Sequence, residues 1–436
     1  MFLLFFSFFS TQSRAIQTYG RFSIGAAATT EKFKSVDSGS DRNDTLFSSQ
    51  RFFYKVSDIG ENQWEVTTDL RNKYDSFDKL NKELLQLDSK NEFQVQQLST
   101  RMLNPNGSLS PTLGRFQIPE AGAVFVDGIN LQYRLTSNWY SGLFGGLNPK
   151  QIDKTTLVSD NKATEAGAFF TYQKRTGDWE TNQYLSHGLV QQKYNNQIER
   201  QFIFQNGVYQ WQADSRIMSL VYLDFTPRTH VQTMYLIYQQ GVSHSFSFEI
   251  GQLGIDSVEY LRRQNVLERL DPSSYKETHV RLDYRLDSDQ TLSLASSVGE
   301  RSADQLKRTD VSLGYRLQNF ISKKWDTQFK IISRKNFTSQ DNILSWSLGY
   351  FSRSYEIILD ADYAIQKNDD GITTHPNNTE LSFTNFFSKE IFASAVLQRS
   401  TDEAVTILGT FVKFGYRFGN QELPPIRDGA APRGSL

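Results

Sequence analysis

Alternating apolar and polar residues form the dominant pattern of the chain from residue 17 to residue 418. Segment 279–286, HVRLDYRL, places Val, Leu, Tyr and Leu on one face and Arg, Asp and Arg on the other. The same period of two recurs in WEVTTDL (64–70), VSLGYRL (311–317), LSWSLGY (344–350) and VKFGYRF (412–418). Because successive side chains of a β-strand point to opposite faces, each segment predicts a strand with one apolar and one polar face.

The apolar residues of the chain are unusually aromatic and are spread thinly. Among 436 residues there are 33 Phe and 20 Tyr, while hydrophobic residues make up 38% and the mean hydropathy is -0.51. A lipid-facing barrel wall carries aromatic girdles near both membrane interfaces. Beyond the N-terminus, no stretch approaches the roughly 18 apolar residues of a membrane-spanning helix. We therefore predict an all-β fold, a transmembrane antiparallel up-and-down β-barrel with an even strand number between about 16 and 22.

Three parts of the chain are expected. Residues 1–15 contain the apolar run MFLLFFSFF and the small-residue site Ser13-Arg14-Ala15, which predict a cleaved signal peptide. The basic residues expected before that run are missing, so either the start lies upstream or the signal is atypical. Residues 16–418 form the barrel, and the Pro- and Gly-containing residues 419–436 form a disordered periplasmic tail.

Breaks in the alternation predict how the strands connect, with short turns at one end of the barrel and longer loops at the other. Tight turns are expected near Gly177, Asp289, Ser354 and Ser388, and longer loops at 148–162, 255–276, 335–342 and 367–378. Segments 92–103 and 113–118 are marginal strands. Segment 256–270 departs from period two and is either a short helix folded into the lumen or, slightly favoured, an external loop.

Two stretches carry a family resemblance. The first is TYGRFSIG (18–25), and the second is LGRFQIPEAGAVFVDGINLQYRLTSNWYSGLFGGL (113–147). Their order of a Gly-Arg strand, a loop with Pro-Glu and Gly, a Tyr-Arg strand, a tight turn and a Gly-rich strand resembles the general bacterial porins. In porins the loop after the Gly-Arg strand is long and folds into the lumen. Here only residues 119–124 remain, too few to cross a wide pore, so the porin constriction is the least transferable feature.

The resemblance also implies a transverse field, with a carboxylate on the constriction loop facing arginines on the opposite wall. The matching carboxylate is Glu120, and the candidate arginines are Arg21, Arg51, Arg115 and Arg134. Further residues expected to face the lumen are Arg281, Asp283, Arg285, Arg316, Lys413 and Arg417. The simpler interpretation is that the glycines of this region relieve crowding and that the arginines are ordinary lumen residues with carboxylate partners.

Residues that would carry catalysis are sparse. The chain has five His and no Cys, and it contains no HExxH, GxxxxGK or GxSxG motif. We therefore expect no enzyme activity, no catalytic residue, no cofactor and no metal site. Lys plus Arg total 47 against 48 acids, and this balance argues against nucleic-acid binding.

Taken together, these features predict a porin-like channel of the bacterial outer membrane for passive diffusion of ions and small hydrophilic solutes. Its expected partners are outer-membrane lipid, lipopolysaccharide, the barrel-assembly machinery and the solutes themselves, and homo-oligomerisation stays open. The alternative is a barrel that acts as adhesin, receptor or envelope scaffold through its external loops. A plugged active transporter is disfavoured, because the strand pattern begins by residue 18 without a preceding plug.

Overall fold

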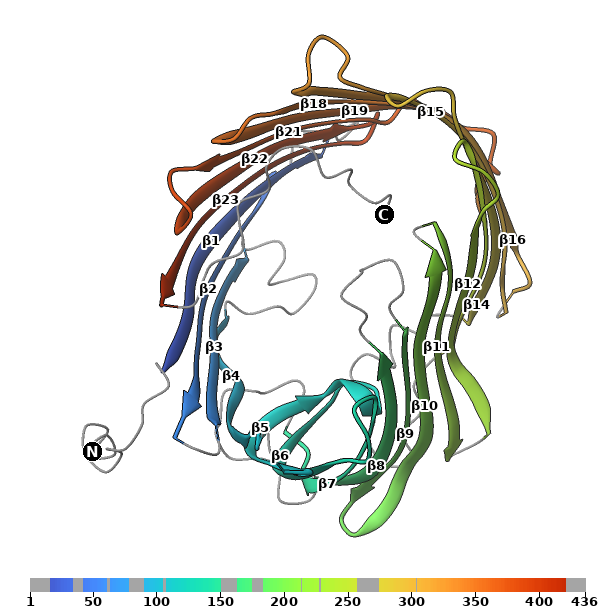
Figure 1. Cartoon of the computed structure of the whole chain (residues 1–436). Helices are drawn as coiled ribbons and strands as arrows, with labels where there is room; N and C mark the ends of the chain where they lie inside the picture. The colour runs from blue at the N-terminus through green and yellow to red at the C-terminus, as the bar shows by residue number, and fades with distance from the viewer. Residues whose placement is uncertain are drawn as a thin grey trace.

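The protein is a closed, all-β barrel in a computed structural model (Figure 1). The structure describes residues 16–33, 42–60, 63–77, 90–104, 107–149, 163–174, 183–212, 214–226, 229–256, 274–302 and 304–420. Within these ranges no helix is long and apolar enough to cross a membrane. The predicted signal peptide, most of the tail and most of segment 256–270 lie outside the described residues.

The strands follow one another around the wall in chain order. They are β1 (Gln17–Phe33), β2 (Arg42–Ile59), β3 (Trp64–Phe77), β4 (Lys90–Met102), β5 (Leu109–Ile118), β6 (Val124–Arg134), β7 (Trp139–Leu147), β8 (Ala163–Lys174), β9 (Gln183–Tyr194), β10 (Gln197–Gln212), β11 (Ser215–Thr226), β12 (His230–Gly241), β13 (Phe246–Ile255), β14 (Tyr275–Arg285), β15 (Gln290–Arg301), β16 (Lys307–Gln318), β17 (Trp325–Lys335), β18 (Ser339–Phe351), β19 (Tyr355–Asn368), β20 (Thr373–Thr374), β21 (Asn377–Phe386), β22 (Ile391–Thr401) and β23 (Val405–Gly419). One 3-10 turn, η1 (Pro119–Ala121), joins β5 to β6.

Antiparallel pairing between β1 and β23 closes the barrel, with Tyr19 opposite Gly419 and Phe33 opposite Val405. The 23 strand segments make 22 wall strands, because β20 and β21 both pair with β19 and continue one another. Pro376 lies between β20 and β21, and proline has no N–H to donate to a strand ladder. The predicted fold class and the even strand number are confirmed.

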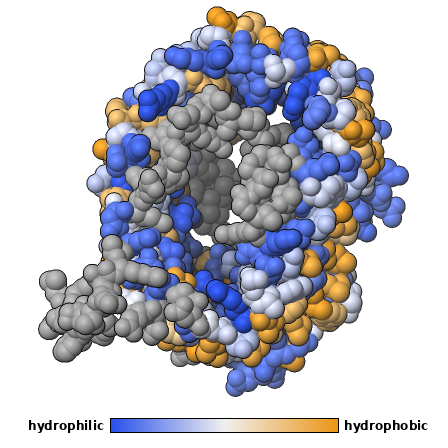
Figure 2. Space-filling model, in the orientation of Figure 1, coloured by the Kyte–Doolittle hydropathy of each residue, from blue (hydrophilic) through white to orange (hydrophobic). Residues whose placement is uncertain are grey.

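The two faces of the wall differ as the alternation predicts. Val311, Leu313 and Leu344 lie on the outer face, each about half exposed. Aromatic side chains gather on the outer face at the end where β1 begins and β23 ends, hereafter the terminal end. They include the pairs Trp139 with Phe170, Trp325 with Tyr350, and Tyr54 with Phe418. Figure 2 shows hydrophilic residues around a hollow centre and hydrophobic residues along the outer flank.

The connections correct part of the expected loop pattern. Turns at Ser354 and Ser388 are present, and Asp289 ends the turn between β14 and β15, whereas Gly177 lies outside the described residues. The loop expected at 335–342 is wrong, because β17 runs to Lys335 and β18 starts at Ser339. The loop expected at 367–378 is likewise partly strand. Both segments are rich in polar residues on both faces of the strand. Composition alone does not distinguish such a strand from a polar loop. The marginal segments proved to be the separate strands β4 and β5.

Candidate functional site

One hairpin leaves the barrel wall and enters the lumen. β4 and β5 pair over only four residues, from Leu98 opposite Arg115 to Arg101 opposite Thr112. At this point Gly114 has φ +111°, a conformation that favours glycine, and a Cβ there would lie 2.2 Å from the carbonyl oxygen of Leu98. Beyond Gly114, β5 and β6 stay paired with each other. β6 pairs with β7 only from Asp127 onward, so residues 124–126 do not pair with β7. The tip of the hairpin is therefore free of both neighbouring strands and bends inward (Figure 1).

The hairpin tip is held inside the barrel by apolar packing. The side chains that the tip turns toward the barrel wall are buried, with exposed fractions of 9% or less: Phe116, Ile118, Ala121, Val124 and Val126. They pack in one cluster with inner-face residues of β7 to β10: Phe144, Phe169, Val190, Phe202 and Phe204. Burying side chains of this size typically stabilises by about 1.5 to 3 kcal/mol each. A patch of inner wall that would otherwise face water is thereby covered by the hairpin.

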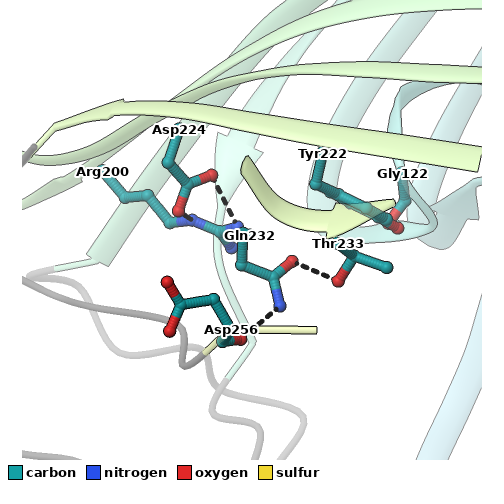
Figure 3. Close-up of polar contacts among 7 residues, drawn as sticks. All are labelled: Gly122, Arg200, Tyr222, Asp224, Gln232, Thr233 and Asp256. Atoms are coloured by element: carbon teal, nitrogen blue, oxygen red, sulfur yellow. Dashed lines mark hydrogen bonds and ion pairs between the residues drawn. The ribbon is translucent and has the colours of Figure 1, made fainter. Parts of the chain in front are cut away.

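Backbone contacts fix the tip against the wall. The Tyr222 hydroxyl on β11 donates to the Gly122 carbonyl at 3.1 Å (Figure 3), and the Ser186 hydroxyl on β9 donates to the Glu120 carbonyl at 3.0 Å. A Cβ on Gly188 would lie 2.7 Å from the Ala121 Cα, so glycine at this position of β9 makes room for the tip. The inward segment is thus the whole hairpin rather than a long loop, which corrects the expectation that too few residues are present to narrow the pore.

The seam where β5 leaves β4 is closed by one ion pair. Arg115 binds Asp127 of β6 through two hydrogen bonds of 2.6 Å, and its Nη1 donates to the Val95 carbonyl of β4 at 3.1 Å. A guanidinium thus satisfies a carbonyl at the point where the β4–β5 ladder stops. Arg115 is only 6% exposed, so it is sealed in the wall and does not face the open lumen. Its partner Asp127 was not recognised in the sequence, because it shares the strand face of Ile129 and Leu131.

Basic side chains gather on the inner face of β23, β1, β2 and β3. Arg21 lies opposite Arg417 in register, and both guanidinium groups lie near the Phe392 ring, at 5.8 and 6.0 Å from its centre. Arg51 lies opposite Arg71 and also binds Asp69 through two hydrogen bonds of 2.9 and 2.5 Å. Lys413 shares this inner face. We call this group the basic wall: Arg21, Arg51, Arg71, Lys413 and Arg417.

Glu120 lies away from the basic wall. Its carboxylate accepts a hydrogen bond from the Tyr140 hydroxyl of β7 at 3.3 Å, and its backbone is held by β9. In Figure 1, β9 and β10 lie across the barrel from β1 and β2. The structure therefore places the acidic tip and the basic wall on opposite sides of one lumen.

The other predicted lumen residues lie elsewhere around the inner face. Arg281 is paired with Asp283 at 3.0 Å, and Arg316 is paired with Asp326 of β17. Arg134 and Arg285 are exposed at the terminal end of β6 and β14. These residues do not gather with Glu120, so they belong to a different part of the lumen from the hairpin tip.

A polar recess lies between the hairpin tip and the far ends of β8 to β12, with a volume of about 360 Å³. Arg200 of β10 and Phe202 form part of its lining, and Arg200 binds Asp224 of β11 through two hydrogen bonds of 3.0 and 2.9 Å (Figure 3). Gln232 of β12 donates to the Asp256 carbonyl at 3.1 Å. These residues were missed because a strand pattern shows which face a residue occupies but not which strands meet across the lumen.

Within the described part of the chain, no group of three His, Asp or Glu side chains is placed to hold a metal ion.

Comparisons with known proteins give distant structural likenesses. No family model and no curated protein sequence matches the chain. Among solved structures, OpdQ of Pseudomonas aeruginosa is similar at 8% identity and TM-score 0.46, covering 92% of this chain and 98% of that one. OccAB4 of Acinetobacter baumannii is similar at 8% identity and TM-score 0.44 over the same shares, and OccK1 (OpdK) of P. aeruginosa at 9% and 0.44, covering 92% and 99%.

The wall of the barrel has the features of a membrane-spanning barrel. Every strand of the wall pairs with a neighbour on both sides along at least part of its length. The outer face is apolar and carries an aromatic girdle at the terminal end. A closed barrel is one of two backbone structures that can cross a bilayer, because it leaves few unpaired N–H and C=O groups facing lipid. A polar inner face, an apolar outer face and aromatic girdles are typical of outer-membrane barrels. The chain is therefore a closed β-barrel whose wall has the polarity of an outer-membrane barrel.

Proposed function

We propose that the protein is a passive diffusion channel for small hydrophilic solutes and ions. The observation that carries the proposal is the charge on the inner face, above all the basic wall. Arg21, Arg417 and Lys413 face the interior on adjacent strands, and among the described residues no carboxylate forms an ion pair with any of the three. A dry interior would penalise each unpaired charge by several kcal/mol, whereas a water-filled lumen does not.

The hairpin supports the same proposal, because it narrows the lumen from one side. It packs on β7 to β11, whereas the basic wall lies on β23 and β1 to β3. Narrowing by a fixed element gives size selection, and charged groups at the narrowed level give charge preference.

Single-channel recording in a planar bilayer tests the proposal. We expect stepwise, voltage-independent conductance from protein that shows heat-modifiable migration on gels and fractionates with the outer membrane. Its repeated absence from correctly folded protein would favour the alternative, a scaffold or adhesin acting through external loops. Substitutions that displace the hairpin should raise the unit conductance, and this separates a true lumen current from leakage around the protein.

A further inference from the structure

The recess beneath the hairpin tip contains a buried side-chain oxygen that accepts no hydrogen bond from the described residues. Gln192 of β9 is 4% exposed and lines the recess. Its amide nitrogen donates to a Glu165 carboxylate oxygen at 3.1 Å, but its Oε1 has no hydrogen-bond partner within the described residues. A buried acceptor left without a donor is destabilising, so such a group calls for a partner that the fold itself does not supply.

The lining presents donors and acceptors side by side. Asn148 and Gln192 both donate to the buried carboxylate of Glu165 of β8. Across the recess, the amide of Gln232 donates to the Asp256 carbonyl and accepts from Thr233 (Figure 3). The rings of Phe202 and Tyr222 form the apolar part of the lining, with centres 5.9 Å apart.

Both charged groups of the lining are already engaged by the protein: Glu165 accepts from two amides, and Arg200 is bound by Asp224. An anion would meet the carboxylate of Glu165 and, behind the lining, that of Asp224. A cation would meet the guanidinium of Arg200, which lies 4.3 Å from the centre of the Phe202 ring. Hydroxyl groups both donate and accept, whereas an ammonium ion only donates and a carboxylate only accepts. Amides, an amide-bound carboxylate, an ion-paired guanidinium and aromatic rings therefore suit a neutral solute with several hydroxyl groups.

We propose that this recess binds a neutral saccharide of about disaccharide size, with Gln192 Oε1 accepting a hydrogen bond from one of its hydroxyl groups. Its volume of about 360 Å³ falls within the range of pockets that bind small organic ligands, roughly 300 to 1,000 Å³. The proposal deepens the channel function and rests on it for its biological meaning, since a recess beside the constriction would hold a solute on its way through the lumen.

Isothermal titration of the full-length, detergent-solubilised barrel tests binding without any measurement of current. The probes are sucrose as neutral disaccharide, gluconate as anion and putrescine as amine. We expect heat of binding from sucrose alone. Gln192→Leu and Gln232→Leu, on opposite sides of the recess, should each weaken sucrose binding about tenfold. Gln97→Leu, a half-buried amide on β4 that donates to Ser99, is the matched control and should leave binding unchanged.

Three outcomes would overturn the proposed saccharide site. They are no sucrose binding by folded wild-type protein, stronger binding of gluconate or putrescine than of sucrose, and equal weakening of sucrose binding by Gln97→Leu. Two variants guard against misfolding, and each is checked by heat-modifiable migration before titration. Planar-bilayer current is recorded separately on the same preparations. Current without sucrose binding refutes the saccharide site and is consistent with the proposed channel. Sucrose binding without current refutes the proposed channel function but not the saccharide site.

Discussion

At the scale of single residues, the outer and inner faces of a strand should differ in what they tolerate. Leu313 is 48% exposed on the outer face, opposite Leu294 in register. Because a charge facing lipid cannot be hydrated, Leu313→Lys should lower the free energy of unfolding by about 2 to 4 kcal/mol if the site lies near the bilayer midplane. Urea titration of the barrel in lipid vesicles measures this difference.

The control for Leu313→Lys is Ser297→Lys, which adds the same charge to the inner face. Ser297 lies opposite Asp310 in register, so the new ammonium group meets water and a carboxylate that also binds Arg334 at 2.8 Å. The neighbouring Ser312 is a poorer control, because it is 4% exposed and a lysine would be crowded there. Equal loss of stability from both substitutions would contradict the assignment of faces.

The seam between β4 and β5 gives a second residue-scale prediction. Arg115→Leu leaves the carboxylate of Asp127, which is 16% exposed, without its guanidinium. Breaking a fully buried pair from one side typically costs about 3 to 5 kcal/mol, and we expect a loss toward the lower end because water reaches this carboxylate. Replacing both partners removes the uncompensated charge, so Arg115→Leu with Asp127→Leu should recover most of the loss. Urea titration of wild type, both single variants and the double variant measures the coupling. A double variant as unstable as Arg115→Leu alone would show that the Val95 contact, not the pair, closes the seam.

Alternation predicted single residues well where a strand stays in the wall. The outer positions in 279–286, 311–317 and 412–418 all lie on the apolar face, because a period of two fixes the side once the strand exists. It failed for Arg115, whose strand bends at Gly114. The positive φ at Gly114 depends on the close approach of the Leu98 carbonyl from another strand, and a single sequence carries no record of that neighbour.

At the scale of elements, the inward hairpin is the part of the fold that enters the lumen. Gly188 seats the tip, because any side chain there would collide with the Ala121 backbone. Gly188→Val should therefore push the tip away from β9 and raise single-channel conductance, while the paired wall strands remain. Gly409→Val, on β23 with its nearest contact at 3.6 Å, is a matched control that should leave conductance unchanged. Unaltered conductance in Gly188→Val would mean that the tip does not limit flow.

Much of this element could be anticipated from its sequence, but not its placement. The marginal strand 113–118, a short Pro-Glu loop, a Tyr-Arg strand and a Gly-rich strand were visible between residues 113 and 147. Their apolar side chains were consistent with a lipid-facing hairpin. What sends the tip inward is its fit against Phe144, Phe169 and Phe202, which come from three different strands. Such packing across the lumen is a tertiary property, and strand periodicity does not encode it.

At the scale of the whole molecule, the opposed positions of the acidic tip and the basic wall predict charge selectivity. Arg21→Glu removes a positive charge beside Arg417 and should shift the zero-current potential in a salt gradient toward cations. Glu120→Lys should shift it toward anions. Lys389→Glu, in the exposed turn between β21 and β22, reverses charge at the terminal rim and is the control expected to have little effect.

The size of these selectivity shifts depends on how far each charge acts through the lumen. At 0.15 M salt, charges in water are screened beyond about 8 Å, and at 0.01 M beyond about 30 Å. A field that crosses the lumen should therefore make the Arg21→Glu and Glu120→Lys shifts grow as the salt is diluted, and the two shifts should become non-additive in the double variant. If the shifts stay additive at every salt concentration, each charge acts only on ions passing along its own side. If neither substitution moves the potential of a conducting barrel, ions are selected at another level of the lumen.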